Sequence, residues 1–172
     1  MAFHPRAAIS VLSVLAGMTV LGQSAVPAAE AEEALAFHNK VRKGLGVPPL
    51  AWSDELSAYA QVWADYLASE GCRLEHRPRS GPWAQRHGEN LFYGRGGRYT
   101  ALTASQSWQS EAAEYRYRAL SASNSARTGH YTQMVWRDTE RMGMGQATCP
   151  DGAVIIVANY DPPGNVIGRY PY

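Results

Sequence analysis

Apolar and polar positions follow a helical period in the stretch after Ser53. The hydroxyl of Ser53 is suited to cap a helix, and the carboxylates of Asp54 and Glu55 suit the positive end of its first turn. Beyond them, apolar side chains recur every three or four residues up to Gly71, which predicts one helix with a single buried stripe. The residues of this stripe are Leu56, Tyr59, Ala60, Trp63 and Leu67.

An earlier helix is predicted over residues 31–45, which have helical composition. The glycines and prolines within residues 44–49 end it, because proline cannot continue a helix.

A third helix is predicted to begin near Thr100 or Thr103. One of its faces is apolar and aromatic, except for a single carboxylate. Surface glutamates avoid such faces, so Glu111 requires either a buried partner or a place at the lip of a cavity. The face consists of Ala101, Ala104, Trp108, Glu111 and Tyr115.

The second half of the chain favours strands. Residues 142–148 and 153–160 are predicted to form an antiparallel hairpin, because the Pro-Asp-Gly sequence between them is typical of a turn. Residues 72–98 read as a long ordered loop with a short strand near 89–93. Residues 121–128 are small and polar and read as a loop, whereas residues 132–136 fit a helical turn or a strand. This pattern indicates an α+β fold in one domain.

The N-terminal residues read as an export signal. A nearly continuous run of apolar or small residues follows Arg6, and the small residues of 26–29 offer a cleavage site. We therefore predict a signal peptide at residues 1–29 and a mature domain at residues 30–172. The mature chain is expected to be secreted, or periplasmic in a Gram-negative bacterium, with no transmembrane segment.

Charge is balanced, with 16 lysines and arginines against 15 aspartates and glutamates. Only Arg6 precedes the predicted cleavage site, so the mature domain carries no net charge with neutral histidines. This balance argues against nucleic acid as a partner. One stretch is locally basic, which fits a solvated loop better than a rim for anionic polysaccharide or membrane headgroups. Its arginines are Arg73, Arg77, Arg79, Arg86, Arg95 and Arg98, and its acids are Glu75 and Glu89.

The chemistry is concentrated at residues 129–136, where His130 enters a heavy apolar run. Such a histidine is held half-buried, so its neighbours set its protonation and tautomer. From spacing alone, a core histidine bonded to a backbone carbonyl is the main alternative to a site residue. Together with residues 159–165, this stretch resembles the two signatures of the CAP superfamily of secreted, cysteine-rich and pathogenesis-related-1-like proteins. Shorter matches at residues 38–42, 46–52 and 88–91 precede these signatures and lie in the same order as in the family.

The resemblance implies a three-layer α-β-α sandwich with a small antiparallel sheet, and a cleft lined by two histidines and two glutamates. The matching residues are His76, Glu89, Glu111 and His130. His87 stands close to Glu89 and competes with His76 for the assignment. His38 also matches a family position, but we expect it to support packing or a local hydrogen bond rather than bind a ligand.

Two imidazoles and two carboxylates suit a divalent metal, zinc above all, with His76 and His130 as ligands. The sequence has no His-Glu-x-x-His helix and no Gly-x-Ser-x-Gly elbow. We therefore expect a non-enzymatic binding protein, with a metal-dependent hydrolase or protease as the alternative. The resemblance also implies a lipid or sterol ligand and a role in defence or host–microbe contact. No catalytic residue is assigned.

The chain has two cysteines, and export makes a disulfide between Cys72 and Cys149 the expected state. Alignment of the predicted hairpin with the family places Met144 and Ala158 where relatives carry two further cysteines. A whole second bridge is therefore expected to be absent.

Overall fold

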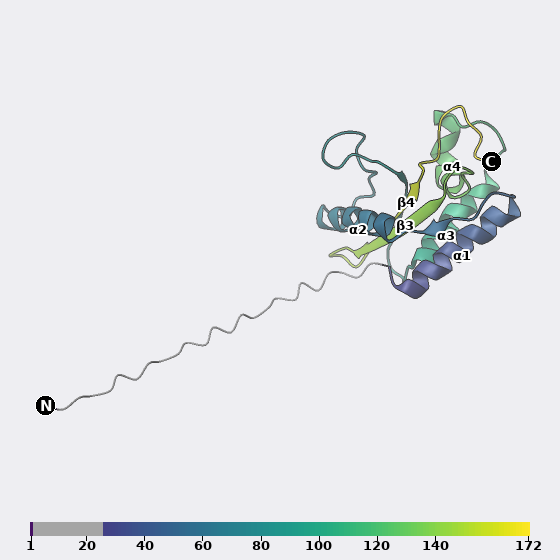
Figure 1. Ribbon diagram of the computed structural model, residues 1–172. Coiled ribbons are helices and arrows are strands. Elements are labelled where there is room, and N and C mark those ends of the chain that lie inside the picture. The colour runs from purple at the N-terminus through teal and green to yellow at the C-terminus, as the bar shows by residue number, and fades with distance from the viewer. Residues whose placement is uncertain (2–25) are drawn as a thin grey trace.

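The computed structural model describes Met1 and residues 26–172 as helices packed on a small sheet (Figure 1). The elements are α1 (Ala28–Gly44), β1 (Ala51–Trp52), α2 (Asp54–Ser69), β2 (Gly88–Gly94), α3 (Ala101–Ser110), the 3-10 helix η1 (Glu111–Ala113), α4 (Ala122–Met134), β3 (Arg141–Thr148) and β4 (Val154–Asp161). Among these helices, none is both long and apolar enough to cross a membrane. Most of the predicted signal peptide falls on residues 2–25, outside the described residues, so that boundary stays a prediction.

The strands form one mixed sheet in the order β1-β3-β4-β2. The predicted hairpin is confirmed as β3 and β4, and β2 pairs antiparallel with β4. An antiparallel sheet was predicted, but the sheet is mixed because β1 runs parallel to β3. A strand of two residues is too short to show a periodic pattern. Met144 lies directly opposite Ala158 on the neighbouring strand. These are the two positions where relatives are expected to carry further cysteines.

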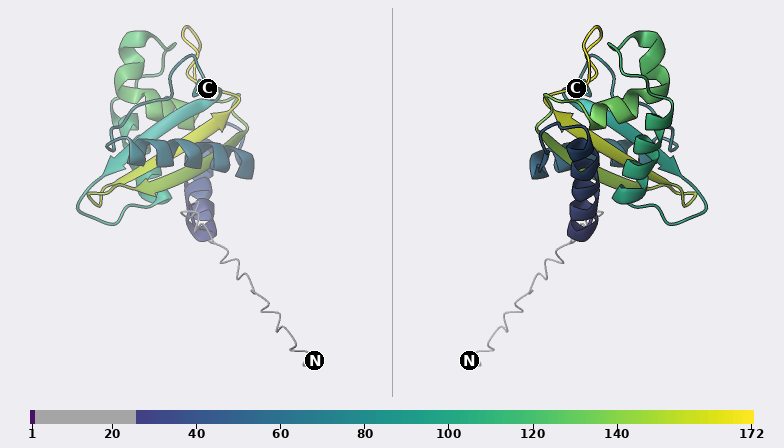
Figure 2. Two further views of the ribbon diagram at one scale, coloured as in Figure 1. Left: turned by 90° about the vertical axis from the view of Figure 1, so that its left-hand side faces the viewer. Right: turned by 90° about the vertical axis from the view of Figure 1, so that its right-hand side faces the viewer.

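Helices cover both faces of the sheet, which confirms the predicted α-β-α sandwich. α2 lies across one face, and α1, α3 and α4 cover the other (Figure 2). The core under α2 includes Trp63 and Val157, whereas the opposite core includes Met134 and Ile156. Strand residues alternate between the two cores because successive side chains point to opposite faces.

Two glycines of β3 let α2 lie directly against the sheet. A Cβ atom at Gly143 or Gly145 would collide with the α2 backbone at Ser57 or Gln61. Ser57 donates a hydrogen bond to the carbonyl of Met144 at 2.6 Å. This close packing holds the first half of α2 against β3.

The prediction of a loop at residues 121–128 is wrong, because residues 122–128 form the start of α4 and Ser121 is its N-cap. Ser121 caps the helix by accepting from the backbone N–H of Asn124, and the Asn124 side chain accepts from the N–H of Ser121. Serine and asparagine favour loops and helix caps alike, so composition alone did not separate the two. Residues 132–136 were predicted to be a helical turn or a strand. The structure shows that they are helical as far as Met134, where α4 ends.

Arg42 ties α1 to the segment between α4 and β3. Its side chain has no exposed surface, and it donates to four backbone carbonyls at 2.7 to 3.0 Å. Burial lowers its pKa to about 10, so it remains a cation at neutral pH. The four acceptors are the carbonyl oxygens of Pro48, Met134, Trp136 and Thr139. They fix the end of α4, the helix that carries His130.

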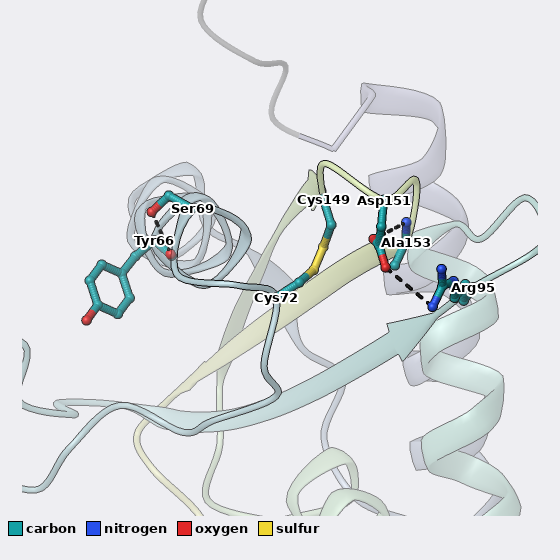
Figure 3. The surroundings of a disulfide bond; sticks show 7 residues. All are labelled: Tyr66, Ser69, Cys72, Arg95, Cys149, Asp151 and Ala153. Carbon is teal, nitrogen blue, oxygen red and sulfur yellow. Dashed lines mark hydrogen bonds and ion pairs between the residues drawn. A yellow bond between two sulfur atoms is a disulfide. The ribbon is translucent and has the colours of Figure 1, made fainter.

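The predicted disulfide joins Cys72, just after α2, to Cys149, just after β3 (Figure 3). Cys149 begins the turn between β3 and β4, and an ion pair between Asp151 and Arg95 at 3.5 Å holds the other side of this turn. The disulfide therefore anchors the start of the long loop that carries His76.

Candidate functional site

Glu111 has a partner in His130, which is partly buried rather than fully buried as its place in an aromatic stripe suggested. Its Oε1 lies 2.6 Å from Nδ1 of His130, and its Oε2 accepts the backbone N–H of Tyr131 at 3.1 Å. The imidazole also stacks on Trp108, with ring centroids 6.2 Å apart. The pair thus joins the end of α3 to α4 and holds the imidazole of His130 from two sides.

Glu89 at the start of β2 forms a second pair of the same kind. Its Oε1 lies 2.9 Å from Nδ1 of His76 and accepts the backbone N–H of Arg77 at 3.0 Å. Its Oε2 accepts a long hydrogen bond from Asn159 at 3.4 Å. The carboxylate is fully buried, whereas the His76 side chain is half-exposed. His76 belongs to the loop, so the carboxylate is the fixed member of this pair.

Arg77 supplies the positive charge that Glu89 needs. Its guanidinium lies 3.7 Å from Glu89 Oε2, packs over the Tyr59 ring at 4.0 Å and donates to the Tyr59 carbonyl. Trp63 and Trp83 lie on the same guanidinium at longer distances. Burial lowers the pKa of Arg77, and the neighbouring Tyr59 and Glu89 oppose that shift. The sequence marked Arg77 only as one of several arginines, because its aromatic neighbours are distant along the chain.

Adjacent residues of β2 connect the two pairs. Glu89 pairs with His76, and the next residue, Asn90, donates to the backbone carbonyl of His130 at 3.0 Å. Within the described residues, no three members of the predicted tetrad bring their ligand atoms within 4.8 Å of one another.

One group of possible ligands does meet that distance, namely Cys72, Cys149 and Asp151. The two sulfur atoms are joined in the disulfide. Because a metal binds the thiolate form of cysteine, this group is not available to a metal while the bond is intact.

A polar pocket of about 380 Å³ opens beside the buried carboxylate of Glu89. It lies between the start of β2, the end of α4 and the segment after β4. Its lining includes Arg79, Arg86, His87, Glu89, Gln133 and Asn165. His87 thus reaches the pocket, but its Nδ1 lies 3.2 Å from Asp161 rather than on a glutamate of the predicted tetrad.

Comparison with known proteins decides the family. Residues 35–160 match the family model described as CAP, the cysteine-rich secretory protein family. The chain belongs to this family.

Plant pathogenesis-related proteins are among the similar CAP proteins. Pathogenesis-related protein 1C of Nicotiana tabacum is 36% identical over 170 residues, which cover 99% of this chain and 97% of that protein. Pathogenesis-related protein 1 of Arabidopsis thaliana is 39% identical over 141 residues, covering 82% of this chain and 81% of the relative. The similarity to the first protein thus extends over nearly the whole of both chains.

Solved structures support the fold. NaASP2 crystallised with Zn2+ aligns with a TM-score of 0.74 at 24% identity, covering 87% of this chain and 88% of NaASP2. BmVAL-1 aligns with a TM-score of 0.72 at 23% identity, covering 87% and 84% of the two chains. At these identities the likeness concerns the fold alone.

His38, the further histidine at a position matched in the CAP family, has the structural role expected from the sequence. It is fully buried, with Nδ1 donating to the Ala34 carbonyl at 2.8 Å and Nε2 lying 2.9 Å from the Tyr160 hydroxyl. Burial lowers its pKa to about 4. Because a carbonyl only accepts, the neutral ring carries its proton on Nδ1 and accepts from Tyr160 at Nε2.

This network reaches the candidate site. Asn90 donates both to the Tyr160 hydroxyl at 3.3 Å and to the carbonyl of His130. His38 therefore supports His130 through two intermediate side chains. The network depends on tertiary contacts, and in the sequence only the family match at His38 hinted at it.

Proposed function

We propose that this CAP protein is a secreted binding protein that holds a divalent cation through His76 and His130. One observation carries the proposal. In each pair the carboxylate occupies Nδ1, while among the described residues nothing hydrogen-bonds to Nε2. A carboxylate on Nδ1 directs the lone pair of a neutral imidazole to Nε2, the arrangement usual for metal-binding histidines.

The donor set fits a weak zinc site. Both carboxylates are already engaged, Glu89 by His76, Arg77 and Asn159, and Glu111 by His130 and the Tyr131 amide. Two imidazoles are thus the protein ligands on offer, with water completing the coordination. A bound zinc ion would supply Lewis acidity and positive charge to a ligand beside the two histidines. NaASP2, a protein of similar fold, was crystallised with Zn2+.

Calorimetry tests this proposal. Wild-type protein at neutral pH is expected to take up zinc, and His76→Ala or His130→Ala is expected to abolish uptake without unfolding the protein. His87→Ala is the matched control, because His87 lies nearby but is not paired with Glu89 or Glu111. Absence of uptake by the wild type, or loss of uptake in His87→Ala alone, would overturn the assignment.

Binding is favoured over catalysis by the burial of Glu89. Its side chain has no exposed surface, so it cannot act as a base toward water in the cleft. Glu111 is partly exposed but holds His130 and a backbone amide. A metal-dependent hydrolase remains the alternative function, and a peptide-cleavage assay with added zinc tests it on the same sample.

A lipid or sterol ligand is the second part of the proposed function. A groove of about 390 Å³ between α1 and the start of α2 is lined largely by apolar side chains, including Val26, Ala31, Leu35 and Trp52. This volume is within the range usual for small-molecule sites. Cleavage at residue 29 would remove Val26 but leave the other three residues in place.

We expect saturable binding of a sterol or fatty acid that is recovered chemically unchanged, and weaker binding by Leu35→Asp. Exposed Val62→Asp is the control, because Val62 does not line the groove. Failure of every member of a sterol, fatty-acid and phospholipid panel would count against this part. The names of the plant relatives favour a role in defence or host–microbe contact. We place this role outside the cell because the N-terminal residues read as an export signal.

A further inference from the structure

The arginine-rich stretch of residues 73–98 divides into two groups in the folded protein. Arg73, Arg77 and Arg95 each have a carboxylate within 4.0 Å. Arg79, Arg86 and Arg98 have no carboxylate partner within that distance among the described residues. The local positive charge therefore belongs to these last three residues.

Two of the three line one pocket. Arg79 and Arg86 both reach the polar pocket of about 380 Å³ beside Glu89, whereas Arg98 follows the opposite end of β2. The backbone N–H groups of the loop that carries them are hydrogen-bonded: Gln85 donates to the Pro78 carbonyl, and Arg86 donates to the Tyr59 side-chain hydroxyl. Two arginines that have no carboxylate partner among the described residues thus line the same cavity.

The negative charge of Glu89 at this pocket is already offset. Arg77 lies 3.7 Å from the Glu89 carboxylate and also donates its backbone N–H to it. Arg86 lies close enough to Arg77 for their repulsion to contribute to the lowered pKa of Arg77, after the larger effect of burial. An anion between Arg79 and Arg86 would relieve this repulsion.

Two glycines form part of the wall and let Gln133 pack directly against the backbone there. A Cβ atom at Gly88 or Gly164 would collide with the Gln133 side chain, and Gln133 is itself buried and bonded to the Gly164 amide at 3.1 Å. Both glycines line the pocket, so their backbone lies close to any occupant. The wall is built for a small polar group rather than for an acyl chain.

We infer that this pocket binds an oxyanion, a phosphate or carboxylate group, between the guanidinium groups of Arg79 and Arg86. A planar guanidinium presents two parallel N–H donors, which match the oxygens of such a group. The pocket shares Glu89 with the candidate site, and the inference does not rest on zinc binding there. It requires no metal.

Inorganic phosphate is the first probe. The mature protein is titrated at low ionic strength in the presence of a chelator, and the amide signals of Gly88, Gly164 and Asn165 are followed by NMR. Saturable shifts are expected. The double variant Arg79→Gln/Arg86→Gln is expected to weaken binding by roughly tenfold or more, because it removes charge-assisted hydrogen bonds.

The control variant Arg73→Gln/Arg98→Gln removes the same charge from the same stretch but leaves the pocket lining intact. It is expected to bind phosphate as the wild type does. Absence of saturable shifts in the wild type, or equal weakening in the control, would overturn the inference. All four substituted side chains are at least partly exposed, and thermal unfolding checks that each variant folds.

Vesicles of phosphatidylcholine with and without phosphatidic acid identify the source of the oxyanion. Capture that requires both phosphatidic acid and the two arginines indicates a lipid headgroup, whereas binding of free phosphate alone indicates a soluble ligand. Either result supports the site. Zinc uptake measured on the same variants keeps the two proposals apart, because Arg79→Gln/Arg86→Gln is expected to retain zinc and His130→Ala is expected to retain phosphate.

Discussion

The two histidine–glutamate pairs use the same chemistry but are built differently. In one, a helix and an aromatic ring fix the histidine, while Glu111 lies at a helix end and is partly exposed. In the other, the sheet and Arg77 fix the carboxylate of Glu89, while His76 lies half-exposed on a loop. The first pair is therefore an extension of the core. The second depends on whatever holds the loop in place.

This difference concerns stability as much as binding. The loop of His76 is held by the disulfide at its start and by the buried ion pair of Arg77 with Glu89. The pair of His130 is held by α4 and by the buried network from His38. Changes on one side are expected to disturb one pair and spare the other.

Loss of the disulfide is expected to have the largest effect. The bridge spans 77 residues of sequence, and the chain-entropy model gives a stabilisation of roughly 4.5 kcal/mol for such a loop. Cys72→Ala/Cys149→Ala should lower the free energy of unfolding by about that amount in urea denaturation. The rate of hydrogen exchange should then rise far more at the Arg77 amide, which donates to Glu89, than at the Tyr131 amide, which donates to Glu111. Two free thiols in the exported protein, or an equal rise in the exchange rates of both amides, would contradict this expectation.

Replacement of Arg77 is the next largest change. Arg77→Met leaves the buried carboxylate of Glu89 without its cation, which we expect to destabilise the protein by about 3–5 kcal/mol. Arg73→Met is the matched control, because its pair with Glu75 is exposed and is worth less than about 1 kcal/mol. Urea denaturation measures both variants. A second change, Glu89→Gln, should recover part of the loss in the Arg77→Met background, and no recovery would show that the buried charge is not the cause.

The sequence reached these two pairs by different routes. A carboxylate inside an aromatic helical stripe marked Glu111 before any family was considered, because helical spacing is local. His76 and Glu89 lie in and beyond an irregular loop, so only the motif resemblance identified them. The α+β class and the hairpin were predicted for the same local reasons, whereas the three-layer sandwich came from the family resemblance. β1 was too short to detect. Arg77, Asn90 and Asn159 support the site through contacts distant in sequence, for which no local pattern exists.

Acid should weaken the side of the molecule that carries His130. His38 has a folded pKa of about 4, lowered chiefly by burial from 6.5, so the unfolded chain takes up its proton first as the pH falls. Its contribution to stability is complete above about pH 6.5 and should fall by roughly 3 kcal/mol by pH 4. Urea denaturation across this range measures the slope. His38→Gln should be less stable at pH 7 but lose less stability on acidification, and an unchanged slope would contradict the assignment.

The tautomers of the two paired histidines test the central claim most directly. If the carboxylates direct the imidazoles as proposed, His76 and His130 carry their proton on Nδ1 when neutral and present Nε2 as the ligand atom. Long-range 15N NMR of the imidazole rings, recorded at neutral pH before and after zinc addition, reads both states. We expect Nδ1–H tautomers for both residues and a zinc-dependent shift at both Nε2 atoms, with His38 unchanged. Protons on Nε2, or a zinc shift confined to His87, would contradict the claim.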